Sequence, residues 1–93
     1  MKEKSLLQTE RECIFCKNPN VELHHVFYGT ANRRLSDEDG CVVWLCRYHH
    51  TGQGGVHRNK DLDNLIKWKM EKAWIERFGT EDDFRKRYGK SFL

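Results

Sequence analysis

The side chains best suited to bind a metal ion are concentrated in the first 57 residues of the chain. All five histidines and all four cysteines lie between positions 13 and 57, and four of the histidines form the pairs His24-His25 and His49-His50. Thiolate and imidazole groups are the usual protein ligands of zinc and related ions. These residues are sufficient for two metal sites in a chain of 93 residues.

Four of these residues repeat one spacing. Cys13-x-x-Cys16 is followed by Cys46-x-x-His49, and the two pairs together form a Cys₃His set typical of a closed, tetrahedral structural Zn²⁺ site. Such a site would join the start of one strand to the end of another and stabilise a hairpin too small to fold alone. A disulfide or free buried cysteines are the alternative interpretation. Cys41 is left over, and we interpret it as a small buried hydrophobic residue.

The remaining histidines predict a second, open metal site. Adjacent residues of a strand point to opposite faces, so one of His24 and His25 can bind an ion while the other faces water or substrate. His50 and His57 could complete a set of three imidazoles, which leaves coordination positions free, as in catalytic sites. The fourth histidine titrates near neutral pH and could act as a general base. Ordinary surface or core histidines are the alternative interpretation.

The elements that must position these residues follow from the local patterns. We expect one domain, with residues 1–11 as a lead-in. Segments 21–28 and 41–45 are rich in β-branched and aromatic residues and predict an antiparallel hairpin. The polar segment 29–40 is expected to be the loop between them, and a short helix is expected to start near Cys46.

Two further helices are expected after the glycine-rich segment at 52–55. Residues 60 to about 78 predict a long helix, with Asn59 as N-cap and Gly79 just beyond its end. Residues 80–83 resemble a capping box that opens a last short helix carrying Phe84 and Tyr88. The face of the long helix expected to pack on the hairpin carries Leu62, Ile66, Met70, Ala73 and Trp74. Trp68 and Ile75 lie on the opposite face and predict contact with the last helix or with a partner.

Composition and charge narrow the class of protein. Charged residues make up 33% of the chain and the net charge is +3, from 17 Lys and Arg against 14 Asp and Glu. Cationic residues beside the histidines would suit a phosphate polymer, although charge alone favours an ordinary solvated surface. We see no apolar leader and no stretch of transmembrane length. We therefore expect a cytoplasmic protein, and in that reducing compartment Cys-x-x-Cys favours zinc over a disulfide.

The chain resembles the HNH endonuclease family in the order of four motifs: Cys13-x-x-Cys16, Leu23-His24-His25-Val26, Leu45-Cys46-x-x-His49-His50 and Gly55-Val56-His57. The resemblance covers about residues 12 to 58 and is greatest to small HNH proteins of phages and prophages. It therefore implies the cytoplasm of a bacterium or of a phage-infected host cell. It implies an α+β fold of the ββα-metal, or His-Me finger, type. Residues 1–93 would be one nuclease-like domain, with a core at 12–58 and C-terminal helices at 59–93.

The resemblance also implies roles for the histidines. His24, His50 and His57 take the places of the ligands of one catalytic divalent ion, which could be Mn²⁺, Ni²⁺, Zn²⁺ or Mg²⁺. His25 takes the place of the general base, and His49 stands where the second cysteine of the second zinc knuckle usually lies. The family hydrolyses phosphodiester bonds of nucleic acid and leaves 5′-phosphate ends, so double-stranded DNA is the expected partner.

One position departs from the family pattern. The Asn that helps to orient the general base is replaced by Cys41, so a backbone carbonyl or Asn32 would have to take over that task. Arg33 is a candidate for contact with the reacting phosphate. The wider set of expected nucleic-acid contacts is Arg33, Arg34, Arg58 and Lys60.

Two other functions compete with an endonuclease. A non-catalytic zinc module that binds DNA or protein would need only the Cys₃His site. A nuclease subunit of a phage packaging or recombination complex would meet its protein partner through the C-terminal helices. Trp68 and Ile75 would suit such an interface, although helix packing explains them as well.

Overall fold

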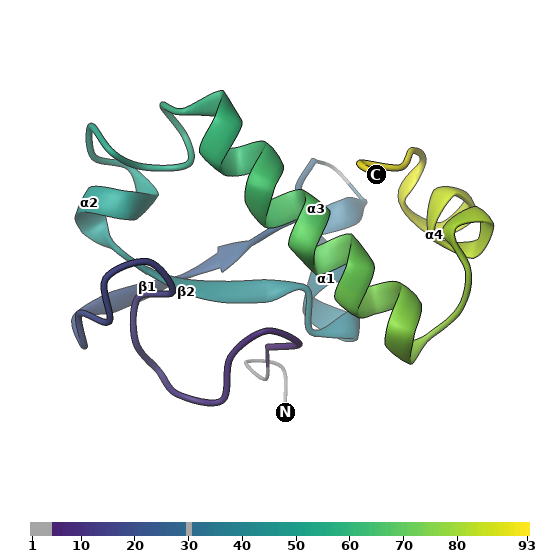
Figure 1. Cartoon of the computed structure of the whole chain (residues 1–93), viewed down its shortest axis with the longest axis horizontal. Coiled ribbons are helices and arrows are strands. Elements are labelled where there is room, and N and C mark those ends of the chain that lie inside the picture. Colours follow the sequence, from purple (N-terminus) through teal and green to yellow (C-terminus); the bar gives the residue numbers. More distant parts are fainter. Residues whose placement is uncertain (1–4, 30) are drawn as a thin grey trace.

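The computed structural model describes residues 5–29 and 31–93. These described residues form a two-stranded antiparallel sheet and four helices (Figure 1). In chain order the elements are β1 (Val21–His25), α1 (Asn32–Asp39), β2 (Val42–Cys46), α2 (Arg47–His50), α3 (Lys60–Arg77) and α4 (Glu81–Tyr88). This small α+β arrangement agrees with the expected fold class at the level of a hairpin packed on helices. No helix in the described part of the chain is long and apolar enough to cross a membrane.

The hairpin is the centre of the molecule. Its register pairs Val21 with Cys46 and His25 with Val42. All five residues of β2 are buried, because α3 crosses over the sheet and the N-terminal segment runs along it (Figure 1). That segment also satisfies the free edge of β2: Ile14 N donates to Trp44 O at 3.0 Å, and Trp44 N donates to the Gln8 side chain at 2.8 Å. The expected strands were thus correct in place, although β1 ends at His25 and not at residue 28.

The prediction of a loop at 29–40 was wrong for most of its length, because residues 32–39 form α1. The segment carries no apolar stripe, and the helix is instead held by tertiary contacts. The Ser36 hydroxyl is fully buried, donates to Phe27 O at 2.6 Å and accepts from Phe27 N at 3.2 Å. Gly40 ends the helix with φ of 81°, a left-handed conformation that glycine adopts without strain.

Helices α3 and α4 begin as the sequence predicts. Leu62 N donates to the Asn59 side chain at 3.2 Å, and the capping box of α4 joins Thr80 and Asp83 in both directions. Of the predicted inner face, Ile66, Met70 and Trp74 are buried and Leu62 is partly buried, while Ala73 is only half-buried.

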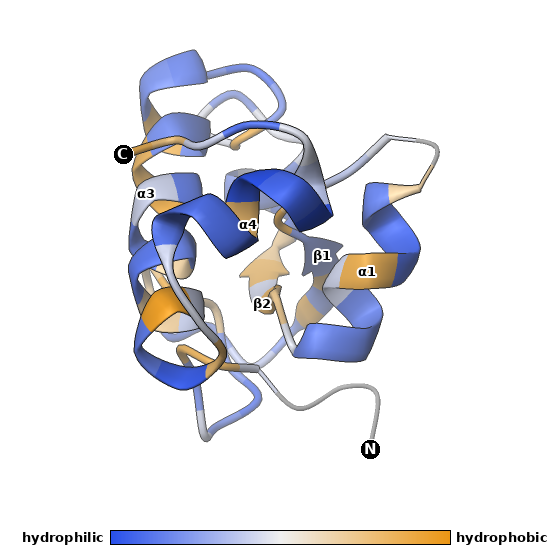
Figure 2. Ribbon diagram, turned by 90° about the vertical axis from the view of Figure 1, so that its right-hand side faces the viewer, coloured by the Kyte–Doolittle hydropathy of each residue, from blue (hydrophilic) through white to orange (hydrophobic). Residues whose placement is uncertain are grey.

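Trp68 and Ile75, the two residues predicted on the opposite face of α3, differ in burial. Ile75 packs against the core, whereas Trp68 is 41% exposed. Figure 2 shows the apolar colour of β2 enclosed by α1, α3 and α4, whose ribbons are mostly in hydrophilic colours. The hairpin is therefore packed into the core along β2, and its ends are available to carry a site.

Candidate metal centres

Cys13, Cys16, Cys46 and His49 converge on one point. One ligand atom from each lies within 4.8 Å of all the others. Tetrahedral Zn²⁺ with the usual bond lengths separates two sulfur ligands by about 3.8 Å and a sulfur from a nitrogen by about 3.6 Å. The Cys16 and Cys46 sulfurs are 3.6 Å apart, and His49 Nδ1 is 3.5 Å from Cys13 Sγ and 3.2 Å from Cys46 Sγ. These four residues could therefore hold a metal ion such as zinc.

Local backbone structure places these ligands. The turn after Cys13 is closed by Lys17 N, which donates to Cys13 O at 2.8 Å, and Lys17 has φ of 65°. Burial acts to raise the pKa of the Cys13 thiol, but backbone N–H groups of Cys46, Cys16 and Phe15 outweigh it and lower that pKa to about 6. The Cys13 side chain is therefore ready to form the thiolate that binds zinc.

The imidazoles of His24, His50 and His57 form a second cluster. Their ligand atoms lie within 4.8 Å of one another. Their ring centroids are 5.2 Å (His24–His50), 5.2 Å (His24–His57) and 4.9 Å (His50–His57) apart. Imidazoles bound to one ion at the usual zinc–nitrogen distance, at angles between octahedral and tetrahedral, have centroids about 4.6 to 5.3 Å apart. The three rings thus have the separation that a shared ion requires.

A buried nitrogen in this cluster has no partner. His24 is 3% exposed, and its Nε2 forms no hydrogen bond with any described residue. Burial, reinforced by the nearby His50 and His57, lowers the pKa of His24 to about 3. The ring is therefore neutral at physiological pH, and a neutral imidazole nitrogen without a hydrogen-bond partner is one that a metal ion could satisfy.

A tight loop brings His57 back to His50. Val56 N donates to His49 O at 2.9 Å, and His57 N donates to His50 O at 3.3 Å. The loop lies so close to α2 that a Cβ on Gly55 would be 2.6 Å from the His50 carbonyl oxygen. Glycine at position 55 is thus what allows the third histidine to reach the other two.

Glu22 is a neighbour of this cluster that sequence reasoning missed. Its Oε1 lies 2.8 Å from His50 Nδ1, and this contact lowers the pKa of the Glu22 carboxyl. A carboxylate on one ring nitrogen fixes the orientation of an imidazole and leaves the other nitrogen for a metal. The available signal was the spacing of Glu22 and His24, because residues two apart on a strand lie on the same face.

The three histidines open onto a pocket of about 200 Å³, whose remaining lining residues are Leu23, His25, Tyr28 and Arg33. His25 Nε2 lies 3.5 Å from Asp37 Oδ1. The structure therefore brings four histidines and one arginine of the predicted site to a single pocket, and it adds Asp37 beside them.

A larger groove of about 540 Å³ adjoins this pocket and shares Tyr28 and His57 with it. Its cationic residues are Arg58, Lys60, Lys67 and Lys90. Asp63 pairs with Lys67 at 3.0 Å and accepts a hydrogen bond from Tyr28. Lys67 and Lys90 were not predicted, because they come from the middle of α3 and from the C-terminal tail.

The other predicted residues lie away from the pocket. Asn32 donates to the Tyr88 carbonyl oxygen at 3.0 Å, and Arg34 pairs with Glu38 along α1 at 2.7 Å. Cys41 is fully buried, as interpreted from the sequence, and burial raises the pKa of its thiol to about 12. The Tyr88 hydroxyl oxygen lies 3.6 Å from Cys41 Sγ.

In comparisons with protein-family models, curated proteins and solved structures, nothing matched this chain.

Proposed function

We propose that this protein is a metal-dependent endonuclease of the HNH type that hydrolyses phosphodiester bonds in double-stranded DNA. The observation that carries the proposal is the unpartnered, buried Nε2 of His24, whose ring lies beside those of His50 and His57. A structural protein has little reason to bury a polar nitrogen without a partner, because this costs free energy. The open pocket beside it also contains His25 and Arg33.

The residues present fit the two ions that this function needs. Cys13, Cys16, Cys46 and His49 would hold a structural Zn²⁺. His24, His50 and His57 would hold a second divalent ion, with Glu22 orienting His50. When bound, the second ion would polarise the phosphodiester and offset negative charge on the leaving oxygen. An α+β hairpin joined to α2 by the first ligand set is the arrangement expected of a ββα-metal fold.

The side chains of the pocket supply the remaining chemistry. His25 takes a proton from a water molecule, and the water oxygen forms a bond to phosphorus. The bond from phosphorus to the 3′ oxygen breaks, and that oxygen leaves with its electron pair and takes up a proton from solvent. The products are a 5′-phosphate and a 3′-hydroxyl. The Arg33 guanidinium donates to nonbridging phosphate oxygens and holds them in place.

The cationic groove beyond His57 supports a polymeric substrate over a single phosphate ester. No ion pair joins Arg33, Arg58, Lys60 or Lys90 to an acid within residues 5–29 and 31–93. Their charges are free to contact phosphates on both sides of the bond that is cut. Such contacts hold the backbone and do not read bases, so we expect cleavage with little sequence preference.

The test is nicking of supercoiled plasmid DNA. Protein treated with a chelator and reloaded with zinc at the Cys₃His site should nick DNA when Mn²⁺ or Ni²⁺ is added, and His25→Ala should lose this activity while it keeps its melting temperature and zinc content. The control variant is Lys69→Ala, which removes an exposed positive charge from α3 at a residue that does not line the pocket. DNA binding without metal-dependent nicking by the wild type would refute the proposal and favour a non-catalytic zinc module.

A further inference from the structure

We propose that Asp37 is a positioning residue for His25, with its carboxylate accepting from Nε2–H so that Nδ1 is free to take the proton of water. This inference rests on the proposed function. His25 Nε2 and Asp37 Oδ1 are 3.5 Å apart, and their side chains are 15% and 27% exposed. The contact is therefore partly shielded from water, and a small rotation of the ring would shorten it to a hydrogen bond, as catalytic contacts often do when substrate binds.

The task needs a residue other than the one at the usual family position. Cys41 is fully buried and contacts the Tyr88 hydroxyl, and Asn32 donates to the Tyr88 carbonyl. Both side chains are thus directed toward α4. Among the described residues, Asp37 is the one acid within ion-pair distance of His25.

Helix α1 holds Asp37 in a defined place because its other polar residues are tied to the core. Ser36 bonds to both backbone groups of Phe27, two residues after His25. Asp39 accepts from Trp74, Arg87 and Tyr88, on α3 and α4. These contacts fix the rotation of the helix about its axis, which matters because displacement of a catalytic group by about 1 Å can cost about 100-fold in rate.

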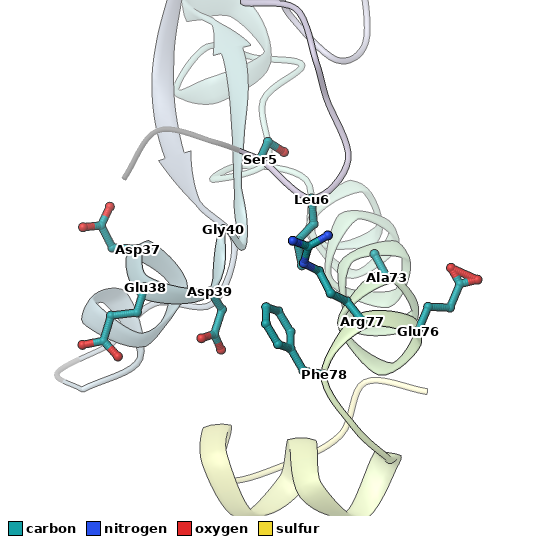
Figure 3. A pocket seen from close by; sticks show the side chains of 10 residues that line it. All are labelled: Ser5, Leu6, Asp37, Glu38, Asp39, Gly40, Ala73, Glu76, Arg77 and Phe78. Atoms are coloured by element: carbon teal, nitrogen blue, oxygen red, sulfur yellow. The ribbon is translucent and has the colours of Figure 1, made fainter. Parts of the chain in front are cut away.

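The carboxylates of Asp37 and Asp39 point to different sides of α1, although both residues line one hollow. A hollow of about 600 Å³ between α1, the N-terminal segment and the end of α3 is lined by Asp37, Asp39, Arg77 and Phe78, among others. Figure 3 shows Asp39 extended toward Phe78 and the Asp37 carboxylate turned to the opposite side of the helix. Asp37 is thus free of the anchoring contacts that occupy Asp39, and among the described residues its ion-pair partner is His25.

The experiment compares Asp37→Asn with Glu38→Gln in plasmid nicking at saturating Mn²⁺. Each variant removes one negative charge from α1 with almost no change in shape, and the ion pairs of Glu38, with Arg34 and Arg87, lie at the surface. We expect Asp37→Asn to lower kcat by about 10- to 100-fold with KM and DNA affinity unchanged. We expect Asp37→Glu, which can reach the same nitrogen, to regain part of the rate, and Glu38→Gln to match the wild type.

A purely structural role for Asp37 would lower the melting temperature and leave kcat of the folded protein unchanged, and that result would overturn the inference. Equal kcat values for wild type and Asp37→Asn would overturn it as well, while the proposed nuclease function would stand. Absence of nicking by both the wild type and Glu38→Gln would instead overturn the proposed function and this inference with it.

Discussion

Replacement of Asp39 by alanine should destabilise the protein more than any other single change on α1. Its carboxylate accepts four hydrogen bonds: from Trp74 Nε1 at 2.8 Å, Arg87 Nε at 2.6 Å, Arg87 Nη2 at 2.8 Å and the Tyr88 hydroxyl at 2.8 Å. These bonds join the connection between the strands to both C-terminal helices. The Asp39 side chain is only 12% exposed, so water cannot readily replace it.

The magnitude follows from the groups left behind. Loss of one partner from a buried ionic network costs about 3–5 kcal/mol, but the Arg87 side chain is 33% exposed and solvent screens its part. The buried donors of Trp74 and Tyr88 each cost about 1–3 kcal/mol when left without an acceptor. We expect a total near 3 kcal/mol, which corresponds to a fall in melting temperature of about 12–24 °C for a domain of this size.

The assay is urea and thermal denaturation at a fixed concentration of free Zn²⁺, because ligand binding contributes to apparent stability. Glu38→Ala is the matched control, since its ion pairs with Arg34 and Arg87 are exposed and should contribute no more than about 1 kcal/mol. If the free energies of unfolding of Asp39→Ala and Glu38→Ala differ by less than about 0.5 kcal/mol, the reasoning that α1 is anchored through Asp39 is wrong.

Two further outcomes concern the metal ligands. Cys16→Ser should release zinc and unfold the domain, because metal binding worth about 10–16 kcal/mol is coupled to folding at such sites. Zinc content and circular dichroism measure these two effects. A melting curve like that of the wild type would contradict a structural site. The free energy of unfolding of protein lacking the second ion should fall as pH decreases from about 6.5 toward 3. The reason is that the unfolded chain protonates His24 near its ordinary value, whereas the folded chain holds its pKa at about 3. His24→Asn should lose this part of the pH dependence in urea titrations at pH 7, 6 and 5, and equal slopes for both proteins would show that His24 is not the cause.

Features governed by local rules were predictable from the sequence. The spacing of Cys13 and Cys16, repeated at Cys46 and His49, identified a ligand set whose atoms converge in the structure. Asn59 and Thr80 marked the starts of α3 and α4, because a cap is decided by the few residues next to it. The apolar spacing of Ile66, Met70 and Trp74 identified the buried face of α3 for the same reason: the helical period brings them to one side.

Tertiary structure decided what depends on contacts between distant segments. Helix α1 has no apolar period that would predict it, and contacts from distant segments hold it in place: Phe27 bonds to Ser36, and Trp74, Arg87 and Tyr88 bond to Asp39. The same folding brings Glu22 to His50, Asp37 to His25, and Lys67 and Lys90 to one groove. Residue types and spacing therefore determined which side chains could bind metal, whereas the packing of α1 and the C-terminal helices determined which charged groups surround them. Such long-range pairings depend on how the whole core packs, which no local pattern encodes.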